Sequence, residues 1–139
     1  MNVDAFLDTN VIAYTYSKVP AEAAKRERAK AVMRAGTYGI SGQVLQELYV
    51  VLTRKNYIEL TQDEALIVIE NLRGTPFVSV DAALVEAGIR MSQRFQISYW
   101  DGAILAAAER LGAKTLYSED LSHGQRYGTV TVENPFADL

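Results

Sequence analysis

Short apolar segments alternate with longer amphipathic segments along this chain of 139 residues. The short segments predict strands over 3–7, 38–41, 77–80, 115–117 and 130–132. The longer segments predict helices over 21–35 and 43–55, from Thr61 to about Arg73, from Asp81 to about Phe95 and from Ser98 to Leu111, with a short helix or turn over 9–17. Strands that alternate with helices imply βαβ crossovers. We therefore expect an α/β fold, a three-layer sandwich whose central, short-stranded parallel sheet is flanked by helices.

Length and composition indicate one domain over residues 1–139. Apolar residues make up 49% of the chain, enough for a core, but no run of about 18 apolar residues predicts a membrane span. The N-terminal MNVDAFLDTN carries acidic residues rather than the basic and apolar regions of a signal peptide, and cysteine is absent. These features favour a cytoplasmic location.

Two acidic segments follow predicted strands. Asp8 comes directly after the first strand, and Ser118, Glu119 and Asp120 come after the strand at 115–117. Because ligands bind at the carboxyl ends of the strands in open parallel sheets, both segments are expected at the edge where sites form. Each also has a simpler explanation, since Asp8 can cap the following turn and Asp120 can be a polar loop residue.

Two further acids lie on predicted helices. Glu47 falls between Val44 and Val51 at helical spacing, so it projects along the apolar stripe, either into the protein or at the edge of the stripe with its carboxylate in solvent. Asp101 stands at capping-box spacing from Ser98, and capping alone could account for it. The placement of all four acids together favours one shared site.

Carboxylates in such positions are unfavourable unless their charge is compensated, and a shared divalent cation would compensate it. The chain has no cysteine and a single histidine, His123, which we expect in a surface loop. Any metal would therefore be held by oxygen atoms, which favours Mg²⁺, Mn²⁺ or Ca²⁺. Asn10 follows Asp8 closely enough to orient its carboxylate. The pattern predicts metal-dependent phosphate chemistry.

The net charge of −3 excludes a uniformly basic nucleic-acid-binding protein. Contact with nucleic acid would need a local basic patch. Arg26, Lys30 and Arg34 share one helical face and could grip phosphates, although a solvated face is the simpler explanation.

The four acids lie within four short motifs. These are F-L-D-T-N-V at 6–11, Q-E-L at 46–48, S-Y-W-D at 98–101 and Y-S-E-D-L at 117–121. In order and approximate spacing they resemble the motifs of PIN-domain ribonucleases, and the resemblance covers essentially the whole chain. The short form that ends in E-N-P-F at 133–136 resembles the VapC-type toxins of bacterial toxin–antitoxin pairs. Gly102 departs from the family, which usually has Ala or another helix former there, and this raises the question of how rigidly Asp101 is held.

The resemblance implies a parallel sheet with helices on both faces and an endoribonuclease that uses Mg²⁺ or Mn²⁺ to hydrolyse RNA phosphodiesters. The matching site residues would be the metal-binding and catalytic acids Asp8, Glu47, Asp101 and Asp120, with Asn10, Ser118 and Glu119 as supporting residues. The resemblance also implies a cognate antitoxin protein as partner, and we expect a homodimer.

Three other classes of protein stay open at this point. A haloacid-dehalogenase-like phosphoryl-transfer enzyme would use Asp8 as nucleophile, but it usually has a second Asp where this chain has Asn10. A receiver-like signalling module would need a lysine after a late strand, whereas Lys114 precedes its strand. A catalytically idle protein-binding module is the third, and the intact set of acids argues against it.

Overall fold

In the computed structural model, which describes residues 2–139, six strands form one sheet in the order β3-β2-β1-β4-β6-β5. Their bounds are β1 (Ala5–Leu7), β2 (Tyr38–Ser41), β3 (Phe77–Val78), β4 (Thr115–Tyr117), β5 (Arg126–Tyr127) and β6 (Val130–Glu133). Strands β3, β2, β1, β4 and β6 run parallel, and β5 pairs antiparallel with β6. The first strand of the chain therefore lies inside the sheet, between β2 and β4.

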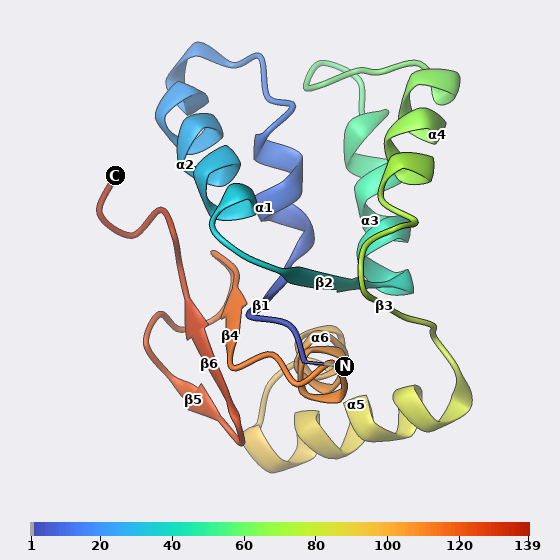
Figure 1. The fold of residues 1–139 in the computed structure, drawn as a ribbon, viewed down its shortest axis with the longest axis vertical. Helices are drawn as coiled ribbons and strands as arrows, with labels where there is room; N and C mark the ends of the chain where they lie inside the picture. Colours follow the sequence, from blue (N-terminus) through green and yellow to red (C-terminus); the bar gives the residue numbers. More distant parts are fainter. Residues whose placement is uncertain (1) are drawn as a thin grey trace.

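Helices lie on both sides of this sheet. They are α1 (Thr9–Tyr14), α2 (Ala23–Arg34), α3 (Gly42–Leu52), α4 (Gln62–Asn71), α5 (Ala82–Phe95) and α6 (Tyr99–Arg110), and a 3-10 turn, η1 (Pro20–Glu22), precedes α2. Figure 1 shows α1 to α4 gathered on one side of the strands and α5 with α6 on the other. The expected α/β architecture is confirmed, with a mostly parallel sheet flanked by helices.

Local side-chain bonds begin the helices where the sequence predicts. Thr61 and Glu64 form the reciprocal bonds of a capping box at α4, and Asp81 accepts from the Leu84 N–H at 2.7 Å to begin α5. Ser98 accepts from the Asp101 N–H at 3.1 Å to begin α6. Within residues 2–139, the Ser98 N–H makes no return bond to the Asp101 carboxylate, so the capping box of α6 is only half-formed.

Several predicted elements differ in their bounds from those observed, and one observed strand was not predicted. The strand predicted over 77–80 stops at Val78 because β2, its neighbour, ends at Ser41 opposite that residue. The helix predicted over 43–55 ends at Leu52, whose carbonyl accepts from the Leu60 N–H at 2.8 Å as the chain turns back. Strand β5 was not predicted, because a strand of two residues is too short to show a hydrophobic period.

The core lies between the sheet and the helices that cover it. Phe6 and Leu7 of β1 and Leu116 of β4 are fully buried, and so are Leu48 of α3 and Leu105 of α6. Helix α6 packs on β2, β4 and β6 and crosses α5. Burial of these side chains fixes the relative positions of β1, β4, α3 and α6, the elements on which the four predicted acids depend.

Gly102 is required by the packing of α6 on α5. A Cβ atom at Gly102 would lie 2.5 Å from the Gly88 carbonyl oxygen and 2.9 Å from the Ser92 backbone nitrogen, both backbone atoms of α5. The departure from the family at this position therefore reflects close contact between two helices. It holds the first turn of α6, with Asp101, firmly against α5.

Substituting Gly102 by Ala is expected to destabilise the protein by roughly 1–3 kcal/mol, because the added methyl group forces the helix backbones apart. Gly74→Ala is the matched control, since a Cβ there has no heavy atom within 4 Å, and its stability should stay near that of wild type. Urea unfolding of the three proteins measures the difference. Equal stability of both variants would contradict the packing role of Gly102.

Candidate active site

Asp8 sits where β1 passes into α1, at the carboxyl edge of the sheet. Its carboxylate accepts from the Thr9 N–H at 2.8 Å, which begins α1, and from the Ser118 hydroxyl at 2.7 Å. Its backbone N–H donates to the Tyr117 carbonyl at 3.0 Å and so continues the pairing of β1 with β4. Asp8 is both a helix cap and a buried acid, only 7% exposed, facing the end of the neighbouring strand.

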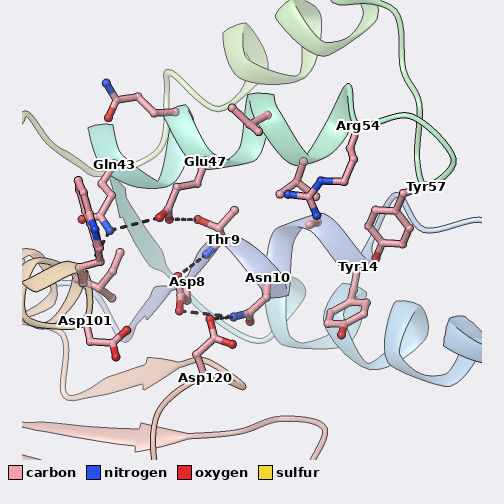
Figure 2. Close-up of a pocket in the computed structure, with 16 residues that line it drawn as sticks. Asp8, Thr9, Asn10, Tyr14, Gln43, Glu47, Arg54, Tyr57, Asp101 and Asp120 are labelled. Atoms are coloured by element: carbon pink, nitrogen blue, oxygen red, sulfur yellow. Dashed lines mark hydrogen bonds between the residues drawn. The ribbon is translucent and has the colours of Figure 1, made fainter. Parts of the chain in front are cut away.

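Glu47 points from α3 toward the end of β1 (Figure 2). One carboxylate oxygen accepts from the Thr9 hydroxyl at 2.8 Å, and the other accepts from the Gln43 side-chain amide at 3.5 Å. The side chain is half-buried, so of the two orientations open from the sequence, the inward one is observed. Thr9 thus links the acid on α3 to the turn that carries Asp8.

Asn10 connects the acids that follow β1 and β4 (Figure 2). Its side-chain amide donates to Asp120 at 3.1 Å and, over a longer distance of 3.5 Å, to Asp8. Its side-chain oxygen accepts from the Glu119 backbone N–H at 3.4 Å. Ser118 accepts from the Asp120 N–H at 3.1 Å. The loop after β4 is therefore held by Asn10 and by a bond within the loop itself.

All four predicted acids line one pocket of about 630 Å³. Asp8 and Asp120 come from strand ends, Glu47 from α3, and Asp101 from the first turn of α6. Other side chains reach the same pocket and were not assigned to the site from the sequence: Thr9, Tyr14, Gln43, Arg54, Tyr57 and Trp100. Figure 2 shows Arg54 and Tyr57 at the end of the pocket away from Asp101.

Negative charge is crowded in this pocket. Burial, opposed by hydrogen bonds from Ser118 and Thr9, raises the pKa of Asp8 to about 6, and repulsion from Asp120 and Glu47 adds to the rise. Burial also raises the pKa of Asp101, and repulsion from Asp120 contributes. A cation bound among these groups would relieve both the desolvation and the repulsion.

The donor set fits a hard divalent cation, because the described residues of the pocket wall supply carboxylate oxygens and include no histidine or cysteine. Within residues 2–139, however, no group of three or more His, Cys, Asp or Glu side chains is arranged so that it could hold a metal ion as it stands. The structure thus brings the four acids to one pocket without a closed set of ligands. Their metal-binding and catalytic roles stay predictions.

Glu119 turns away from the other acids. Its carboxylate accepts from the Tyr14 hydroxyl at 2.5 Å and pairs with the Lys25 ammonium at 3.1 Å. The Lys25 ammonium also lies 5.6 Å from the Phe136 ring centroid, so this cluster ties the loop after β4 to α1, α2 and the C-terminal segment. Glu119 thereby holds the loop that carries Asp120.

The remaining polar candidates lie outside the pocket. His123 is exposed and accepts from the Asn134 N–H at 2.9 Å, as expected for a surface loop residue. Arg26 and Lys30 both pair with Glu27, at 3.2 and 3.5 Å, which favours the solvated-face explanation of that basic stretch. Arg54, in contrast, is a positively charged side chain that does line the pocket.

Comparison with known proteins agrees with this fold. The model of the PIN domain matches residues 5–126 of the chain. No curated protein matches the chain significantly.

Several solved structures share the fold. VapC20 of Mycobacterium tuberculosis, a sarcin-ricin loop cleaving toxin, is 22% identical, with a TM-score of 0.63 over 84% of this chain and 89% of that one. A toxin–antitoxin complex from Klebsiella pneumoniae is 16% identical, with a TM-score of 0.70 over 95% and 98%. FitAcB from Neisseria gonorrhoeae is 21% identical, with a TM-score of 0.61 over 96% and 99%. At these identities the likeness establishes the fold.

Proposed function

The chain belongs to the PIN domain family, and from this premise we propose that it is a metal-dependent endoribonuclease and the toxin of a type II toxin–antitoxin pair. The observation that carries the proposal is that Asp8, Glu47, Asp101 and Asp120 line one pocket at the carboxyl edge of the sheet. A phosphoryl-transfer enzyme with Asp8 as nucleophile is less well supported. Asn10 takes the place of its second acid and bridges Asp8 to Asp120 instead.

Asp8 and Asp101 would bind Mg²⁺ or Mn²⁺ directly, and Glu47 and Asp120 would bind it directly or through water. When bound, the cation supplies a water of lowered pKa and neutralises charge on the scissile phosphate. Ser118 and Asn10 hold the Asp8 carboxylate in one orientation. The acids repel RNA until the cation is present, so Arg54 would provide the first attraction for RNA phosphates.

The expected partners follow from the relatives. One similar structure is a toxin–antitoxin complex and another is FitAB bound to a DNA fragment, which supports an antitoxin protein as partner of this chain.

Within residues 2–139, no helix is long and apolar enough to cross a bilayer. We also propose that residues 1–139 form a single domain, that the protein is a homodimer and that it is cytoplasmic. Growth arrest on expression of the chain alone, relieved by co-expression of the neighbouring gene, would support the toxin role.

Purified protein is expected to cleave single-stranded RNA in Mg²⁺ or Mn²⁺ and to lose this activity in excess EDTA, because the carboxylates alone repel the phosphate and offer no activated water. Gel analysis of end-labelled RNA measures the cleavage, and adding back Mn²⁺ after EDTA should restore it. Full cleavage in EDTA would disprove the metal requirement.

A further inference from the structure

Trp100 is the single tryptophan of the chain, and 63% of it is exposed. Tryptophan is normally well buried, because its large apolar surface is stabilised by removal from water. Trp100 instead lines the acidic pocket, directly before Asp101. An exposed indole at this position contributes little to the core, which suggests that it meets a ligand.

The backbone that carries Trp100 is held in place. Its carbonyl accepts from the Gln43 side-chain amide at 3.3 Å, and the same amide donates to Glu47, so Trp100 is linked to the acid on α3. Its ring packs edge-to-face with Tyr99, with centroids 5.1 Å apart. Gly102 fixes the same turn against α5. The indole is therefore a supported ring beside the acids with most of its surface in solvent.

We propose that Trp100 is a base-stacking residue of the substrate-binding site. It would contact a nucleobase that flanks the scissile phosphate when that phosphate lies at the acids. The inference rests on the proposed nuclease function and adds to it a specific contact with substrate. Bases of any sequence can stack on an aromatic side chain. A base inside a duplex has both faces covered by its neighbours, so this contact requires single-stranded RNA. Arg54, at the far end of the pocket, would meet a phosphate of the same strand, so the RNA would cross the acids between these two side chains.

Intrinsic fluorescence tests the contact directly, since tryptophan emission reports on Trp100 alone. The probes are an oligouridylate RNA and an abasic ribose-phosphate oligomer of the same length, both added to wild-type protein in Ca²⁺. Oligouridylate should quench the emission on saturation. The abasic oligomer, which has the same phosphates and no bases, should bind more weakly and leave the emission nearly unchanged.

Variants separate stacking from a change in fold. Trp100→Ala should weaken binding of fluorescently labelled oligouridylate roughly 5- to 150-fold, and Trp100→Phe should fall between this variant and wild type. Neither substitution should weaken binding of the abasic oligomer further, because the missing base already removes the contact. Ile89→Ala is the matched control. Ile89 is 43% exposed on α5 outside the pocket, and its substitution should leave both affinities unchanged.

The outcomes are distinguishable. Wild-type protein that cleaves RNA in Mg²⁺, with unchanged emission at saturation and equal affinity of Trp100→Ala, would overturn the stacking role and leave the nuclease proposal standing. Emission that responds to the product of the neighbouring gene and not to RNA would make Trp100 a protein contact, which also overturns it. Absence of RNA cleavage and of RNA binding would overturn both proposals.

Discussion

Replacing Asp8 or Asp101 by Asn is expected to lower RNA cleavage by roughly a thousandfold or more while the protein stays folded. Each substitution keeps the shape of the side chain and removes one of the charges that would hold the cation. In the Asp8→Asn protein the new amide oxygen can still accept from the Thr9 N–H. Ser118 can reverse its bond by accepting from the new amide nitrogen, so the start of α1 is preserved.

Single-turnover cleavage of end-labelled RNA in Mn²⁺ measures this loss, and circular dichroism checks the fold. Asp63→Asn is the matched control, because it is the same chemical change on an exposed residue in the first turn of α4, outside the pocket. It should cleave like wild type. An Asp8→Asn or Asp101→Asn protein that keeps wild-type activity would remove that carboxylate from the mechanism.

The metal-free protein is expected to become less stable as the pH rises through about 6, because the pKa of buried Asp8 is raised from 3.8 to about 6. An acid whose pKa is raised by folding destabilises the folded state when it ionises. The penalty is absent below 3.8, grows as the pH rises toward 6 and is complete above it. The difference between the two pKa values corresponds to about 3 kcal/mol.

Urea unfolding in EDTA between about pH 5 and pH 8 measures the effect on the free energy of unfolding. Asp8→Asn should be more stable than wild type at the upper end, and the two should approach each other as the pH falls. Exposed acids such as Glu64 and Asp81, whose pKa values are lowered, lose their stabilisation only below 4.5 and 3.8, outside this window. Saturating Mg²⁺ should stabilise wild type and not the variant. Parallel pH profiles of the two proteins would contradict the assignment to Asp8.

The sequence predicts those parts of the fold that local chemistry determines. Strands β2 and β4 and the starts of α4, α5 and α6 agree with prediction, because alternating apolar residues and capping side chains act within a few residues. The end of β3 and the existence of β5 depend on which strand lies alongside. The fit of Gly102 against α5 likewise depends on the backbone of a distant segment. The sequence shows that Gly102 differs from the residue usual in the family, but it does not explain why.

The candidate site divides in the same way. Placement of Asp8 and Asp120 in one pocket follows from the rule that parallel strands bring their carboxyl ends to one edge. The apolar stripe of α3 places Glu47 near the core but leaves its direction open, and the bond from the Thr9 hydroxyl shows that it points inward. The sequence does not assign Gln43, Arg54 and Trp100 to the site. Gln43 and Trp100 meet across α3 and α6, and Arg54 lines the pocket at its far end, so their places depend on how distant segments pack. The bonds that Tyr14 and Lys25 donate to Glu119 also join segments far apart in the chain, so the sequence could not predict them.

The position of β1 inside the sheet determines when this site can first exist during protein synthesis. Asn10 and Asp120, which meet across the pocket, are 110 residues apart. A ribosome releases the chain from its N-terminus, so β1, α3 and α6 emerge before β4 can dock beside β1 and deliver the last acid. A nascent chain is therefore without its complete acid set until translation has passed β4. Helices α1 to α6 are therefore all synthesised before the proposed nuclease site is complete.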